Sequence, residues 1–210
     1  MFTSVESQIY SMFIISITIL AVLNPFGNLT QFIAMTAELA KSIRQKLFRN
    51  ILYTAFIIVM VFLFSGPFIM RYVFNVSLDD LRIAGGLILI IMATKNLLFT
   101  AKKQDFLHYQ GLDEKDLLRA SVVPMAFPML VGPDTLSTAI IASEDQGLLV
   151  ACGAIVLAFA FMFLLFHFAA TIERIIGKLI LHVFSRIAQV FIMAIGIKMI
   201  IVGIKDIFHL

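Results

Sequence analysis

The sequence predicts an all-α membrane protein with six transmembrane helices, arranged as two inverted three-helix repeats in which helices 1 and 4 are broken near the midplane. Three observations lead to this prediction. Of the 210 residues, 61% are hydrophobic and 14% are charged, whereas an average soluble protein is about half apolar and about a quarter charged. Several apolar runs reach the roughly 20 residues that a membrane-spanning helix needs. The third observation is a weak similarity between the two halves of the chain.

Six apolar runs follow one another along the chain, and the first and fourth are interrupted by proline and glycine. The runs cover residues 9–23 with 29–37, then 48–70, 81–99, 120–142, 148–171 and 183–204. The longest polar stretch between them, at 100–115, is too short for a catalytic domain. The first run follows a segment without Lys or Arg. That segment lacks the basic start of a secretory signal, so we expect the run to remain as a membrane span.

The charges between the runs predict the orientation in the membrane. With six crossings, twelve of the 16 Lys and Arg residues fall on one side and four on the other. The richer side is expected to be cytoplasmic, which places both termini outside. In an alternative arrangement the first and fourth runs are re-entrant hairpins, the charges divide eleven to five, and the termini lie inside. The charge distribution alone does not separate the two arrangements.

The similarity between the halves has two parts, each separated by about half the chain length. Residues 82–84 and 186–188 both read Arg-Ile-Ala, and the segment 27–30 aligns with 132–135. Each half contains three runs, so the second half enters the membrane from the opposite side, as in the inverted repeats of many secondary transporters. We therefore assign 1–105 and 106–210 as the two repeats of one transmembrane domain.

Prolines interrupt the first and fourth runs because proline lacks an N–H donor and keeps the preceding residue out of helical geometry. Residues 24–25 read Asn-Pro, and 128–133 begins and ends with proline. We expect Asn28 to cap the half-helix after the first break. Gly132 should take that place in the second half, with Pro133 at the first helical position. Irregular backbone at membrane depth is tolerated only inside protein or beside a water-filled cavity.

The two breaks predict a binding site for a small solute. Two half-helix N-termini would present free N–H groups to an anion such as a carboxylate, and the carbonyl groups before each break suit a cation or an ammonium group. The expected binding residues are Asn24, Pro25, Gly27, Asn28, Thr30, Gln31, Gly132, Pro133, Asp134, Thr135 and Ser137, with Thr138 beside them. The alternative is two proline kinks whose small polar residues hold helices together. Paired breaks at corresponding positions favour the binding site.

Asp134 is the only carboxylate well inside an apolar run, and an ionisable group within the membrane points to a function. It would bind a substrate amine or carry a coupling Na⁺ or H⁺. The structural alternative is an acid favoured by the dipole of its own helix. Arg82 and Arg186 are expected to begin repeat-related helices, where they either extend toward the membrane interface or gate the site.

Several chemistries have no support in the sequence. The single cysteine, Cys152, excludes an intramolecular disulfide. There is no phosphate-binding loop, no Cys/His metal spacing and no nucleophile beside a base. Membrane topology explains the basic loops without nucleic acid. We therefore expect no enzyme activity, no bound metal and no cofactor. The expected partners are a small solute and the lipid bilayer, and a homo-oligomer is compatible with the sequence.

The segments 24–28, 81–86 and 128–133 resemble motifs of the MarC family, also called the six-helix neutral amino acid transporter family, in the expected order and over nearly the whole chain. The resemblance implies a multi-pass protein of the prokaryotic cytoplasmic (inner) membrane with outward termini. It also implies transport of small neutral amino acids, such as glycine and alanine, driven by a cation gradient. Two positions depart from the family pattern. Thr30 stands where proline is frequent, and Asp134 stands where a small residue is frequent.

These observations predict a secondary transporter of a small solute, with a small neutral amino acid as the expected substrate and alternating access between the two halves. A membrane scaffold or regulatory subunit without transport is the main alternative, and a channel is a third interpretation. Saturable, gradient-dependent uptake would separate the transporter from both.

Overall fold

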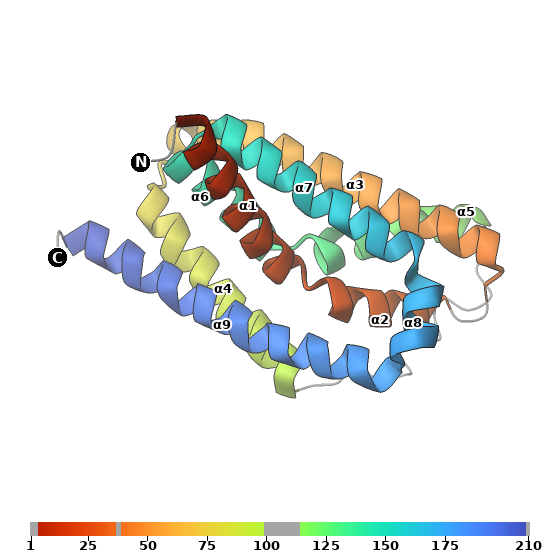
Figure 1. Ribbon diagram of the computed structural model, residues 1–210. Coiled ribbons are helices and arrows are strands. Elements are labelled where there is room, and N and C mark those ends of the chain that lie inside the picture. Colours follow the sequence, from red (N-terminus) through yellow and green to blue (C-terminus); the bar gives the residue numbers. More distant parts are fainter. Residues whose placement is uncertain (1–3, 37–38, 99–113, 209–210) are drawn as a thin grey trace.

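The computed structural model describes residues 4–36, 39–98 and 114–208, and every regular element in these ranges is helical (Figure 1). In chain order the elements are α1 (Ser4–Leu23), α2 (Pro25–Met35), α3 (Lys41–Phe68), η1 (Ile69–Phe74), α4 (Leu78–Leu98), α5 (Glu114–Ala120), η3 (Ser121–Leu130), α6 (Pro133–Gln146), α7 (Leu148–His167), α8 (Ala169–Ile176) and α9 (Lys178–Phe208). The predicted all-helical class is confirmed. The boundary proposed between the repeats at residue 105, and nearly all of the polar stretch 100–115, lie outside the described residues.

The helices provide five or six candidate membrane spans. Within the described ranges, five segments are long and apolar enough, and they are Glu6–Met35, Lys41–Phe74, Leu78–Leu98, Leu148–His167 and Leu179–Phe208. A sixth span results if Asp116–Leu130 and Pro133–Gln146, which are bent by 63°, are taken together. Large apolar side chains cover the outside of the bundle. Leu149, for example, is 85% exposed, and a surface of this kind suits lipid rather than water.

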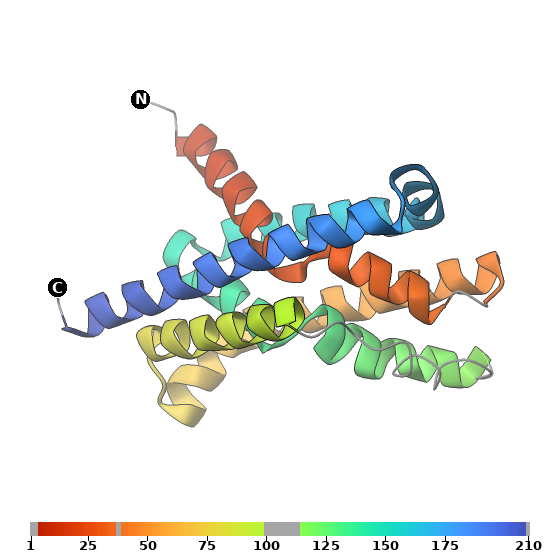
Figure 2. The same cartoon turned by 90° about the horizontal axis from the view of Figure 1, so that it is seen from below.

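Helices α4 and α9 run antiparallel and pack along much of their lengths (Figures 1 and 2). Their backbones approach closely at two glycines, since a Cβ atom built on Gly86 would lie 2.5 Å from the carbonyl oxygen of Gly196. Small residues allow such an approach between helices in membranes. One prediction for this pair is wrong. Because α9 begins at Lys178, five residues before the apolar run, Arg186 lies within the helix and not at its start.

The other helices pack in corresponding pairs. α1 packs against α7 as η3 packs against α3, and α2 packs against α9 as α6 packs against α4. α3 and α7 also contact each other. Between α2, α3 and α7 the rings of Phe32, Phe48 and Phe166 form a cluster with centroid separations of 5.5 to 6.4 Å. This cluster is part of a buried apolar core that fixes the position of α2 against the longer spans.

The two ends of the bundle differ in what they contain. In both views the start of α1, the end of α9 and η1 lie toward the left, and we call this the terminal end. The start of α3, together with α5 and α8, lies toward the right. We call this the basic end, because α3 begins there with Lys41, Arg44, Lys46 and Arg49.

Candidate functional site

The first helix break lies at Asn24, between α1 and α2. Its backbone is left-handed, with φ 44° and ψ 64°, and Pro25 takes the first position of α2. The Asn24 side chain accepts a hydrogen bond from the N–H of Gly27 at 3.3 Å, so Asn24 is the cap. The prediction that Asn28 is the cap is wrong, because Pro25 can begin a helix at once. The Asn28 amide instead donates to the carbonyl oxygen of Leu23 at 2.7 Å, one of the groups that the end of α1 leaves unpaired.

The second break lies between η3 and α6, and its predicted capping arrangement is confirmed. Gly132 precedes α6 with φ −99° and ψ −179°, and Pro133 takes the first helical position. Asp134 follows, and its Oδ1 accepts a hydrogen bond from the N–H of Thr135 at 2.8 Å. A Cβ atom on Gly132 would lie 2.5 Å from this Oδ1. Position 132 therefore has no room for a side chain while the carboxylate keeps this place.

Both breaks border one cavity with a volume of about 820 Å³. The structure thus brings together residues from two distant segments of the sequence. The predicted site residues that line the cavity are Asn24, Gly27, Asn28, Thr30, Gln31, Gly132, Asp134 and Arg186. The rest of the wall comes from η3, from the halves of α4 and α9 that face the basic end, and from Val22 of α1 and Ala34 of α2. Thr30 directs its hydroxyl to its own helix, where it donates to the carbonyl oxygen of Gly27 at 2.8 Å.

The other predicted residues have different positions. Pro25, Pro133, Thr135, Ser137 and Arg82 are not among the residues that line the cavity. The hydroxyls of Ser137 and Thr138 donate to the carbonyl oxygens of Pro133 and Asp134, each at 2.8 Å. α4 covers this face of α6, since a Cβ atom built on Gly85 would lie 2.8 Å from Cβ of Ser137. Ser137 therefore belongs to a packed contact between α4 and α6.

The cavity lining carries charges of both signs. Asp134 is 9% exposed, and it is the only carboxylate among the described residues that line the cavity. Lys95 of α4 and Arg186 of α9 contribute positive charges, and His182 contributes an imidazole. Ionisable groups at membrane depth mark solute or ion pathways. This lining favours a solute that has an anionic group and that offers a cationic group to Asp134.

Arg186 connects α9 to the C-terminal end of α4. Its Nη1 donates to the carbonyl oxygen of Asn96 at 2.8 Å and also to that of Leu97. Its Nε donates to Nε2 of His182 at 3.2 Å. The last carbonyls of a helix lack helical partners, and the helix dipole favours a positive side chain there. Arg186 therefore holds the two helices together at the basic end while it borders the cavity.

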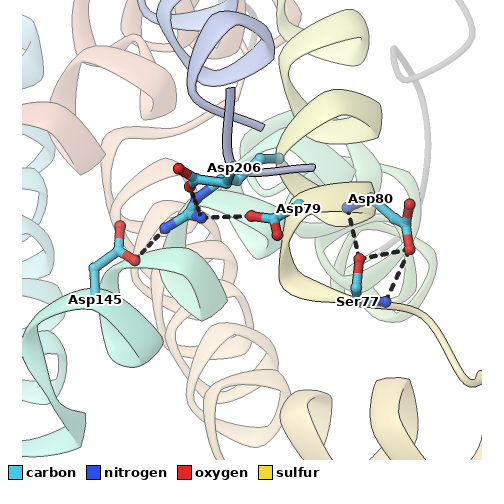
Figure 3. A network of polar contacts seen from close by, with 6 residues as sticks. Ser77, Asp79, Asp80, Asp145 and Asp206 are labelled. Carbon is cyan, nitrogen blue, oxygen red and sulfur yellow. Dashed lines mark hydrogen bonds and ion pairs between the residues drawn. The ribbon is translucent and has the colours of Figure 1, made fainter. Parts of the chain in front are cut away.

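Arg82 makes a different set of contacts, at the terminal end (Figure 3). Its Nη1 donates to Asp79 at 2.7 Å and to Asp206 at 2.9 Å. Its Nη2 donates to Asp145. The side chain is only 12% exposed. We call these four residues the terminal ion-pair cluster. It joins α4, α6 and α9 through one guanidinium group, and it lies outside the cavity.

Several polar residues of the cavity were not predicted as site residues. They are Lys95, Asn96, His182, Ser185 and Gln189. All come from α4 and α9, whose sequences are apolar on every side, so periodicity does not show which face meets the interior. One signal was available in the sequence. Gln189 is a neutral amide inside an apolar run, and such groups in membrane helices bind polar partners.

Apolar spans around a polar cavity define the class, which is a multi-pass integral membrane protein. Comparison with known proteins gives the family. Residues 9–208 match the family described as "MarC family integral membrane protein", so this chain belongs to the MarC family. The family resemblance found in the sequence is therefore confirmed. No solved structure matches the chain.

Relatives of similar length occur in bacteria and archaea. A UPF0056 membrane protein of Buchnera aphidicola subsp. Schizaphis graminum is 31% identical over 207 residues, which cover 97% of this chain and 95% of the relative. The UPF0056 membrane protein YhcE of Escherichia coli is 29% identical over 211 residues, with 98% and 96% covered. A UPF0056 membrane protein of Archaeoglobus fulgidus is 28% identical over 193 residues, with 90% of each chain covered.

Proposed function

We propose that this chain is a secondary transporter of a small solute, coupled to a cation gradient, and not an enzyme. One observation carries the proposal. Two interrupted helices, one from each half of the chain, border the same cavity. Interrupted helices that meet near the middle of the membrane form the solute sites of many transporters. Irregular backbone at that depth needs a polar cavity or protein around it, and both breaks border such a cavity.

The packing supports two inverted repeats. The pairs α1–α7 and η3–α3 correspond if the halves are exchanged, and so do α2–α9 and α6–α4. The repeat-related residues Arg82 and Arg186 contact opposite ends of the antiparallel α4–α9 pair. A two-fold axis in the membrane plane would produce this arrangement. The repeats would then be 1–105 and 106–210, with six crossings.

The substrate that fits the lining best is a small neutral amino acid such as glycine or alanine. Such a molecule carries one carboxylate and one ammonium group. Lys95 and Arg186 provide positive charge for the first group, and Asp134 provides a carboxylate for the second. A volume of about 820 Å³ leaves room for the solute together with water. The coupling Na⁺ or H⁺ would also use Asp134.

The state described by the structure would be open toward the basic end. The cavity is bordered there by Leu98, His182 and Arg186, whereas the terminal ion-pair cluster joins three helices at the other end. Lys41, Arg44, Lys46 and Arg49 begin α3 at the basic end, and Arg119 of α5 and Arg174 of α8 lie there too. This end would therefore face the cytoplasm. Both chain termini would face outward.

The experiment is uptake of radiolabelled glycine and alanine into proteoliposomes under an imposed Na⁺ or H⁺ gradient. Wild-type protein should show saturable uptake that depends on one of the gradients. Asp134→Asn should lose most of that uptake, because the variant retains the shape of the side chain but not its charge.

Asp116→Asn is the matched control, since Asp116 lies on α5 and is 50% exposed. It should transport like the wild type. Flux that does not saturate would indicate a channel instead. No uptake by folded protein under either gradient would favour a scaffold or regulatory subunit. Wild-type uptake in Asp134→Asn would remove Asp134 from the mechanism.

A further inference from the structure

One buried polar atom on the cavity wall has no partner. Gln189 of α9 is 2% exposed and lines the cavity. Its Oε1 accepts a hydrogen bond from Nδ2 of Asn96 at 3.4 Å. Its Nε2 has no hydrogen-bond partner among the residues that the structure describes. Nearly all buried side-chain donors in proteins are paired, so an unpaired donor on a residue that lines a cavity points to an acceptor on a ligand.

The amide of Gln189 has one contact with α4. Asn96 donates to its oxygen at 3.4 Å, which leaves Nε2 as the group that can donate to a ligand. Arg186 donates to the backbone carbonyl oxygen of the same Asn96 at 2.8 Å. Arg186 and Lys95 border the same part of the cavity. The wall formed by α4 and α9 therefore presents hydrogen-bond donors and positive charge.

Gln189 and its counterpart in the first half of the chain have different surroundings. The Arg-Ile-Ala sequence is followed by Gly85 in the first half and by Gln189 in the second. At Gly85 the missing side chain lets α4 pack directly against Ser137 of α6. At the corresponding place in α9 the sequence has a long amide, and the cavity lies beside it. Position 85 therefore allows two helices to pack together, whereas the corresponding position 189 lines the cavity.

We infer that Gln189, whose oxygen is bound to Asn96, donates a hydrogen bond to the carboxylate of a bound α-amino acid. Asp134, in the first turn of α6, accepts the ammonium group. This inference rests on the proposed transport function and extends it by fixing the direction in which the solute lies. The ligand class is a zwitterion with a free carboxylate. A simple amine or a simple carboxylic acid would satisfy only one of the two walls.

The test measures binding of radiolabelled alanine to the purified full-length protein in nanodiscs. Gln189→Met keeps the length of the side chain and removes its polar atoms. The affinity for alanine should fall by about tenfold or more, as expected for loss of a hydrogen bond to a charged acceptor. Val190→Met is the matched control, because Val190 is the next residue of α9 and is 58% exposed. It should bind like the wild type.

Competition distinguishes recognition of the carboxylate from a general loss of binding. Wild type should prefer unlabelled alanine strongly over ethylamine, which lacks the carboxylate. Gln189→Met should lose most of this preference. Asp134→Asn should keep it and instead lose the preference over propionate, which lacks the amine. An unchanged ratio of alanine to ethylamine in Gln189→Met would overturn the inference.

Thermal stability separates a ligand role from a structural one. Gln189→Met removes a buried donor that has no partner, and it also removes the acceptor of the 3.4 Å hydrogen bond from the exposed Asn96. These effects oppose each other, so the empty variant should melt within a few degrees of wild type. A lower melting temperature together with unchanged alanine affinity would assign Gln189 to packing.

A second variant covers poor folding of the first. Gln189→Glu keeps an acceptor for Asn96 and replaces the donor, so it should also bind alanine more weakly. Wild-type affinity in this variant would overturn the inference. If wild type binds and transports alanine while both Gln189 variants do the same, only the inference fails. If folded wild type neither binds nor transports, the proposed function fails and the inference with it.

Discussion

At the scale of single residues, the second break depends on the absence of one side chain. Gly132 is the cap of α6, and the Asp134 carboxylate lies over it. Its extended backbone would be available to other residues, so the glycine is required for space and not for conformation. The first break uses a different solution. Asn24 adopts a left-handed backbone that asparagine tolerates better than most residues, and its own side chain provides the cap.

Gly132→Ala should displace Asp134 and reduce alanine uptake by about tenfold or more, if the carboxylate makes a charged hydrogen bond to the solute. A new methyl group there would meet Oδ1 of Asp134. The measurement is initial uptake rate per folded protein in proteoliposomes. Gly153→Ala is the control, because the atoms nearest to its methyl group would belong to the flexible side chain of Met12. Equal rates in both variants would contradict the assigned position of Asp134.

The sequence predicted the local backbone features of the site better than it predicted which residues line the site. Gly132 and Pro133 were placed correctly because capping depends on neighbouring residues. Asn28 was misplaced by one turn, since both asparagines near Pro25 have capping side chains and only the backbone decides between them. Gln189 and Lys95 were missed as site residues because their positions depend on how α4 and α9 turn toward the other helices.

At the scale of the helices, the α4–α9 pair depends on contact between backbones. Gly86 and Gly196 approach so closely that a larger residue at either position would push the two helices apart. The pair also connects the two ends of the molecule, through Arg82 at one end and Arg186 at the other. The six apolar runs were visible in the sequence. The sixth run begins five residues after the start of α9, and α8 was not predicted. A short amphipathic helix contains no long apolar run, so a search for such runs does not find it.

Gly86→Ala should lower the stability of the folded protein by about 1–3 kcal/mol, the usual cost of overpacking. The reason is that the new methyl group would meet backbone of α9, which cannot rotate away. Thermal unfolding can be followed with a thiol-reactive dye, because Cys152 is a free and partly buried cysteine. Leu87→Ala changes a residue that is 52% exposed, and its melting temperature should stay close to that of wild type. Similar melting temperatures for both variants would argue against close backbone packing.

At the scale of the whole molecule, the uneven distribution of basic residues predicts orientation. We expect the terminal end to face outward. Two positions test this in a Cys152→Ser background. Tyr72 lies in η1 at the terminal end and is 77% exposed, and the side chain of Arg119 in α5 at the basic end is 84% exposed.

On intact cells, a membrane-impermeant maleimide should label Tyr72→Cys and not Arg119→Cys. After permeabilisation both should be labelled, which controls for reactivity. The reverse pattern on intact cells would invert the assignment of the cytoplasmic side. It would leave the helix arrangement unchanged, since that does not depend on which end faces the cytoplasm.

The terminal ion-pair cluster would have to separate before the molecule could open at that end, because Arg82 of α4 binds Asp145 of α6 and Asp206 of α9. These ion pairs favour the state that is closed there, which makes the two faces energetically unequal. In a carrier that alternates between two faces, such a difference makes an empty protein rest mostly with one face open. Half-saturation would then occur at different solute concentrations on the two faces. Net direction would still follow the gradients alone, because a conformational preference changes rates and occupancy and cannot supply driving force.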